Sequence, residues 1–221
     1  MRFPICLLIL SMCCPSQAPQ QPVQDIVQKL LPQPYNTASL KLPKPSERED
    51  AIKQLKKAQR TAYEARAQQI AFLLAVLDVD YQRNRDYLIW VLKGCDVPEI
   101  KNGCDEMTGG YLVFLLQQGH REILAPLLDA SVKDYNAAGS ESLGAFFSQL
   151  VARSPDEFLD AVRSFPPSTQ KKICSFAGSG DGGGMEPSDL KRVRAHLGGM
   201  HDDEVARRCL LQIEHANKPT M

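Results

Sequence analysis

The chain has 221 residues, enough for one substantial domain. Lys plus Arg and Asp plus Glu both total 26, which excludes the large basic field of a nucleic-acid binder, whose affinity depends on neutralising phosphates. Hydrophobic residues make up 43% of the chain, slightly below a typical globular composition, as expected for a folded part preceded by a leader and a linker.

The N-terminus predicts export. Met1-Arg2 supplies a positive end, and an apolar run of ten residues follows, from Ile5 to Cys14. A run of this length fits the hydrophobic region of a secretory signal and is too short to span a bilayer. Residues 1–16 are therefore predicted to be a signal peptide. Alternatively, Leu10-Ser-Met-Cys13 resembles a lipobox, in which Cys13 would carry a lipid. We expect a periplasmic, extracellular or lipid-anchored protein, with the anchor as its membrane contact.

Residues 17–45 are rich in Pro and Gln and are predicted to form an extended linker. One short helix, Val23–Leu31, is expected within it. Residues 46–221 are predicted to form a single all-helical domain. Its first helix is expected to begin at Ser46, where Ser46 and Glu49 have the spacing of a capping box. Because no Pro or Gly follows before Gly94, we expect that helix to continue to about Leu77, with a heptad seam made mostly of alanine.

Apolar residues at helical spacing, interrupted by Gly, Pro and capping residues, predict the later helices. The glycine-rich run 178–184 is expected to be a loop. No segment alternates like a strand, so the predicted class is all-α, with about eight or nine helices packed as successive antiparallel hairpins or as a short irregular α-solenoid. The expected helices are 80–93, 105–118, one from 120 with Pro126 inside it, 140–153, one from 154, 169–177, 187–197 and 202–216.

Three of the seven cysteines lie in the leader. The other four, an even number in an exported chain, favour disulfides. We expect Cys95–Cys104 to close a short loop and Cys174–Cys209 to join two C-terminal helices, with four buried thiols as the alternative. No CxxC motif is present, so the sequence suggests neither a zinc ribbon nor a thioredoxin-like redox site.

The segment from Leu115 to Leu128 resembles the second half of an ankyrin repeat. It has a Gly119-His120 turn, an acid at Glu122 and two apolar pairs. The front half of the repeat, with its Thr-Pro-Leu-His signature, is not matched, and no second copy follows. The resemblance implies a protein-binding array, but arrays need about three units to bury a core. The residues by themselves indicate a tight helical hairpin with His120 in its turn.

The chemical motifs are weak. Gly178-Ser-Gly-Asp-Gly-Gly183 matches a dinucleotide fingerprint in spacing, but no strand precedes it. His196 and His201 are separated by a glycine break, so the nearby acids and Cys209 do not form a recognisable metal motif. Glu64, Glu106 and Glu122 are three of many carboxylates that an acidic hydrolase could use. The sequence therefore assigns no catalytic, cofactor-binding or metal-binding residue, and no cofactor.

These patterns favour a non-enzymatic module of the cell envelope that binds a protein or peptide in a groove between hairpins. The alternative is an envelope hydrolase, for example a glycan-cleaving enzyme, with an unrecognised acidic site. A binding module should show an apolar concave surface. An enzyme should show a cleft in which polar groups with shifted pKa values converge.

Overall fold

The computed structural model describes residues 25–94, 104–132, 137–180 and 182–218. Within these ranges the chain is all-α, as predicted, with eleven α-helices packed against one another. Short 3-10 turns cover Thr37–Ser39 (η1), Pro45–Glu47 (η2) and Arg121–Ile123 (η4). The helices are α1 Ile26–Leu30, α2 Arg48–Gln59, α3 Glu64–Val76, α4 Tyr81–Lys93, α5 Cys104–Gln117, α6 Leu124–Ser131, α7 Ala137–Arg153, α8 Pro155–Arg163, α9 Pro167–Ser179, α10 Pro187–Gly199 and α11 Glu204–Ala216.

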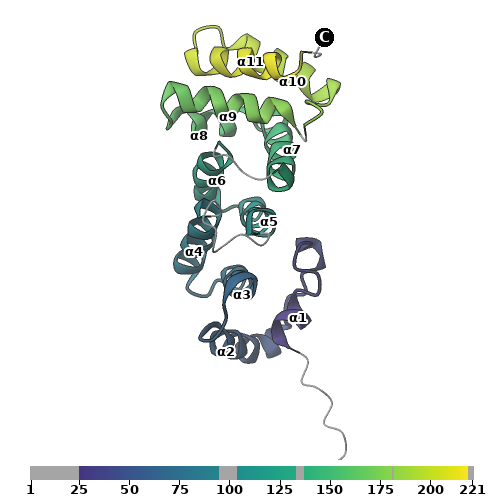
Figure 1. Cartoon of the computed structure of the whole chain (residues 1–221), viewed down its shortest axis with the longest axis vertical. Coiled ribbons are helices and arrows are strands. Elements are labelled where there is room, and N and C mark those ends of the chain that lie inside the picture. Colours follow the sequence, from purple (N-terminus) through teal and green to yellow (C-terminus); the bar gives the residue numbers. More distant parts are fainter. Residues whose placement is uncertain (1–24, 95–103, 133–136, 181, 219–221) are drawn as a thin grey trace, which may run out of the picture.

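The helices stack along one axis in two layers (Figure 1). Helices α3, α5, α7 and α9 form one layer, in which each packs on the next, and α4, α6, α8 and α10 form the other. The hairpins α3–α4, α5–α6 and α7–α8 therefore lie one above another in sequence order. Each hairpin has an apolar side that only a neighbour can cover, so stacking buries one continuous core.

The prediction of one long helix from Ser46 to Leu77 is wrong in two respects. It is broken between Gln59 and Glu64, where Tyr63 is extended and Glu64 has a φ of 46°, and α2 packs back on α3. Its start is also not a capping box, because Pro45 opens a 3-10 turn and no side-chain cap precedes α2. The reversal lets Leu55, which is fully buried, contribute to the core. A straight helix would have carried that side chain away from it.

Part of the predicted linker belongs to the folded body. Helix α1 packs on α2 and α3, and Val27, Leu30 and Leu31 are buried. Further along, the Tyr111 hydroxyl of α5 donates to the carbonyl oxygen of Pro34 at 2.9 Å. The short predicted helix is thus present as Ile26–Leu30, and the segment after it packs against α5 instead of forming only a spacer.

Helices α9 and α11 close the C-terminal end of the stack. Cys174 and Cys209 lie at disulfide distance, with Cα atoms 5.0 Å apart, as predicted. A Cβ added to Gly178 would lie 2.8 Å from the Cα of Ile213, so glycine is what lets the two helices approach this closely. Asn217 fixes the segment between α9 and α10. Its side-chain amide nitrogen donates to Gly178 O at 2.9 Å, and its side-chain oxygen accepts from Met185 N at 2.7 Å.

Candidate functional site

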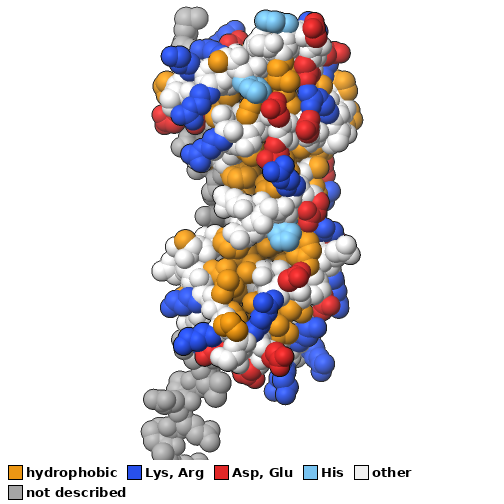
Figure 2. All heavy atoms as spheres, turned by 180° about the vertical axis from the view of Figure 1, so that it is seen from behind, with side chains coloured by type: hydrophobic (Ala, Val, Ile, Leu, Met, Phe, Trp, Pro, Cys, Tyr) orange, Lys and Arg blue, Asp and Glu red, His pale blue; other side chains and the backbone are white. Residues whose placement is uncertain are grey.

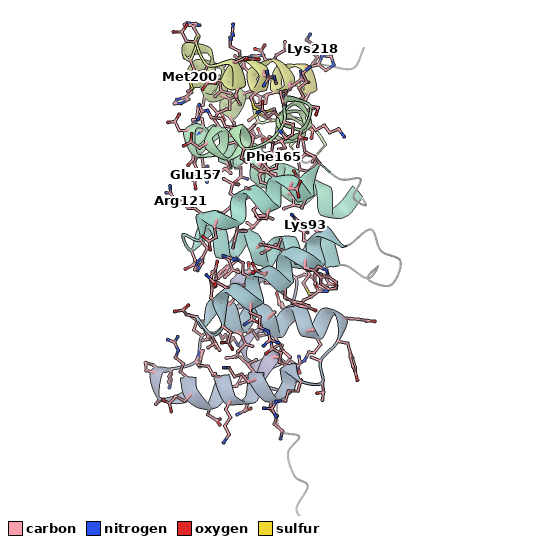
Figure 3. The ribbon with its side chains drawn as sticks, turned by 90° about the vertical axis from the view of Figure 1, so that its left-hand side faces the viewer. Lys93, Arg121, Glu157, Phe165, Met200 and Lys218 are labelled. Carbon is pink, nitrogen blue, oxygen red and sulfur yellow. A yellow bond between two sulfur atoms is a disulfide. The ribbon has the colours of Figure 1, made fainter. Side chains whose placement is uncertain are left out.

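A groove of about 930 Å³ lies on the face shown in Figure 2. It lies between the turn that leads into α6, the junction of α7 with α8, and α10. Figure 3 shows Arg121 and Glu157 from successive hairpins at the same edge of the stack. The groove is lined by Arg121, Glu122, Leu124, Ala125, Ala152, Arg153, Ser154, Pro155, Asp156, Glu157, Asp160, Ala161, Ser164, Arg192 and His196.

The groove has an apolar floor and a charged rim. Leu124, Ala125 and Ala161 are buried or half-buried on the floor, and Pro155 adds a rigid apolar surface. On the rim, Arg121 Nε lies 3.6 Å from Glu157 Oε1, and His196 Nε2 lies 2.9 Å from Asp156 Oδ1. Arg192 pairs with Asp189 at 3.2 Å on its own helix. Most rim charges therefore neutralise one another.

Arg153 is the exception on the rim. It is exposed at the end of α7, and within the described part of the chain it has no ion-pair partner. The next residue, Ser154, is the N-cap of α8, yet its side chain makes no capping hydrogen bond. A guanidinium and the uncapped N-terminal end of a helix thus lie side by side in the chain at the groove. The guanidinium favours a negatively charged group, whereas the first turn of α8 already carries the carboxylates of Asp156 and Glu157.

A polar cluster adjoins the lower end of the groove. The Tyr81 hydroxyl donates to Glu122 Oε1 at 2.7 Å, and the Tyr81 ring stacks on His120 with ring centroids 4.2 Å apart. Arg85 Nη1 lies 3.4 Å from the same carboxylate oxygen. Burial alone would raise the pKa of Glu122, but the hydrogen bond from Tyr81, the backbone and the charges of His120 and Arg85 outweigh it and lower that pKa.

Glu64 and Glu122, two of the carboxylates singled out from the sequence, do not converge. Glu64 begins α3, whereas Glu122 lies in the turn before α6, in the groove, to which α3 contributes no residue. The Glu106 side chain lies outside the described residues. A general acid of a glycosidase needs a raised pKa, and the shift of Glu122 goes the other way. His120 lies in the turn after Gly119, as predicted, and its ring contacts Tyr81.

The remaining predicted residues have structural roles or fall outside the description. Cys13 and Cys95 lie outside the described residues, as does the side chain of Cys104, so the predicted Cys95–Cys104 disulfide and the lipid site stay predictions. Asp203 caps α11 by accepting from the backbone of Val205 at 2.9 Å. Among the described side chains, no three His, Cys, Asp or Glu groups gather closely enough to hold a metal ion.

Sequence reasoning missed the residues that form the groove. Arg121, Arg153, Asp156 and His196 come from four different elements, and no spacing in the sequence relates them. The one available signal was Ser154-Pro155, which correctly predicted a helix start and therefore a turn at this position. That signal gives the place of a turn but not the side chains that meet there.

No protein-family model, curated protein or solved structure matches the chain. No helix within the described ranges is long and apolar enough to cross a bilayer.

Proposed function

We propose that this chain is a non-enzymatic binding module of the cell envelope that holds an acidic peptide segment of a partner protein in the groove. The observation that carries the proposal is a groove of about 930 Å³ with an apolar floor and, on its rim, Arg153, which has no ion-pair partner among the described residues. Its size lies at the upper end of the roughly 300–1,000 Å³ typical of ligand sites. The volume and the open form suit an extended chain segment.

Charge complementarity supports an acidic segment. Glu157 is already paired with Arg121, and Asp156 is in hydrogen-bond contact with His196, so both attract a cationic ligand less than free carboxylates would. Arg153 has no such partner among the described residues, and it adjoins the uncapped start of α8. A carboxylate on the ligand would gain the interaction with Arg153, while small apolar side chains beside it would cover Ala125 and Ala161.

The test is a peptide-display selection on the exported protein, followed by affinity measurements with the selected peptides. We expect acidic peptides that lose about tenfold or more in affinity with Arg153→Glu, since a hydrogen bond to a charged group contributes about 1.5–3 kcal/mol. Arg207→Glu is the matched control, because Arg207 is exposed on α11, outside the groove lining. Peptides that bind both variants equally well, or no selection of acidic peptides, would contradict the proposal.

A hydrolase is the second candidate, and the pairing of His196 with Asp156 in a groove that also contains Ser154 favours it. However, the two side chains are 42% and 72% exposed. An ion pair in water contributes less than about 1 kcal/mol, and catalytic electrostatics depend on groups held away from water. Covalent labelling by a fluorophosphonate probe that His196→Ala abolishes would favour the enzyme; we expect no labelling.

A further inference from the structure

A second concavity is lined by residues around α2, α3 and α4. Figure 1 shows these three helices at the lower end of the stack. The concavity has a volume of about 520 Å³ and shares no residue with the groove. Its walls are mostly polar, and only two alanines among its nine lining residues are aliphatic. They are Lys56, Gln59, Arg60, Ala62, Ala67, Asp80, Arg83, Asn84 and Tyr87.

The charges in this cleft do not balance. Lys56 pairs with Asp80, with 3.1 Å between Nζ and Oδ2. Arg60 and Arg83 also line the cleft, and neither has an ion-pair partner within the described ranges. The two guanidiniums therefore leave an uncompensated charge of about +2 in a concave site, where low-dielectric walls concentrate the field. A bound anion would remove their mutual repulsion.

The neutral groups of the cleft are fixed for hydrogen bonding. Asn84 is buried and donates to the carbonyl oxygen of Val79 at 2.8 Å, while its own oxygen accepts from Gln59 Nε2 at 3.0 Å. This leaves the Gln59 side-chain oxygen as an acceptor without a described partner. Tyr87 adds a half-buried ring and a hydroxyl, and burial raises the pKa of that hydroxyl, so it stays a neutral donor.

We propose that this cleft binds a small phosphate monoester whose body carries hydroxyl groups, such as a sugar phosphate. A phosphate monoester has a charge of about −1.5 to −2 at neutral pH, which matches the two unpaired arginines, whereas a carboxylate would leave one of them uncompensated. Guanidinium groups bind phosphate oxygens through two parallel hydrogen bonds. Ligand hydroxyl groups would bind Gln59 and Tyr87, and the Tyr87 ring would contact the body of the sugar.

Calorimetric titration with glucose 6-phosphate, inorganic phosphate and glucose tests the proposal. We expect saturable binding of glucose 6-phosphate with a Kd of about 1 mM or lower, weaker binding of inorganic phosphate and none of glucose. Arg60→Gln combined with Arg83→Gln should weaken binding at least tenfold. Lys53→Gln combined with Lys57→Gln removes the same charge from exposed positions of α2 outside the cleft and should change the Kd less than about twofold.

Two results would overturn the proposal: no saturable binding of either phosphate compound at millimolar concentration, or equal losses in the two double variants, which would indicate unspecific attraction. Equal affinity for inorganic phosphate and glucose 6-phosphate would overturn the assignment of a hydroxylated body. Because all four substituted side chains are exposed, the variants should fold, which thermal melting monitored by circular dichroism would verify.

Discussion

Replacing Gly178 by alanine should loosen the contact between α9 and α11. The new Cβ would lie 2.8 Å from Ile213 Cα and 3.1 Å from both Ile213 O and the Ala216 Cβ. Since non-bonded carbon atoms prefer about 3.5–4.0 Å, the helices would have to separate by roughly half an ångström or more. The pairing of Cys174 with Cys209, one helical turn away, opposes that movement.

The expected size follows from two opposing effects. Overpacking of a well-packed contact lowers the free energy of unfolding by about 1–3 kcal/mol, whereas replacing glycine by alanine inside a helix raises it by up to about 1 kcal/mol. The backbone cannot relax cheaply here, so we expect a net loss of about 2 kcal/mol. In a chain of this size that lowers the Tm by about 4–8 °C.

Gly110→Ala is the matched control for this experiment. Gly110 also lies inside a helix, α5, but it is exposed and nothing lies within 4 Å of its added Cβ. We expect this variant to be as stable as the parent or more stable by up to about 1 kcal/mol. Thermal melting of the parent, Gly178→Ala and Gly110→Ala under identical conditions tests both expectations. A Gly178→Ala variant that melts at or above the parent temperature would refute the reasoning, as would equal destabilisation by Gly110→Ala.

Three further predictions concern the same framework. Asn217→Ala should lower the free energy of unfolding by about 1–3 kcal/mol, because it leaves Gly178 O and Met185 N without their side-chain hydrogen-bond partner. This loss should be seen as a lower Tm. An unchanged Tm would show that these hydrogen bonds do not stabilise the loop. Glu122 has a lowered pKa in the folded protein, so its carboxylate stabilises the fold above its ordinary pKa of 4.5, and this stabilisation is lost as the pH falls below that value. The Tm of Glu122→Gln should therefore depend less on pH in the acid range than the Tm of the parent. Parallel Tm–pH curves for the two proteins would contradict this prediction. Intact mass of the protein purified from the cells that express it, with and without reduction and alkylation, should show alkylation of Cys174 and Cys209 only after reduction. The same spectra would report the predicted cleavage after Ser16 or the alternative, a lipid on Cys13.

Local signals in the sequence were sufficient to predict helix ends where they act over one helical turn. Gly94 follows the last residue of α4, Gly119 adopts a φ of 102° after α5, and Pro155 and Pro167 open α8 and α9, all near the predicted positions. These residues constrain their own backbone, so their effect does not depend on what packs around them. The all-α class follows from the sum of such signals.

The break between α2 and α3 shows the limit of that reasoning. No Pro or Gly marks it, and the alanine seam continues through it, yet the helix reverses because Leu55 and Ala51 are buried only when α2 lies against α1 and α3. Tertiary burial outweighs the small helix propensities of a few residues. The same burial brings α1 onto the stack, where composition predicted a linker.

The sequence by itself determined the helical class, many helix ends and a turn at Ser154, because each rests on short-range backbone preferences. It favoured the Cys174–Cys209 pairing, which the structure confirms over the other possible pairings of Cys174 and Cys209. Only the tertiary structure decided which charges meet. Among the described residues Arg153 has no ion-pair partner, whereas Glu157 lies against Arg121 and Asp156 against His196, and these distances depend on how the hairpins stack. Gly178, the first residue of the run that matches a dinucleotide fingerprint in spacing, proves to be a point of close contact between α9 and α11. Both candidate binding sites therefore arise from packing, which no local pattern encodes.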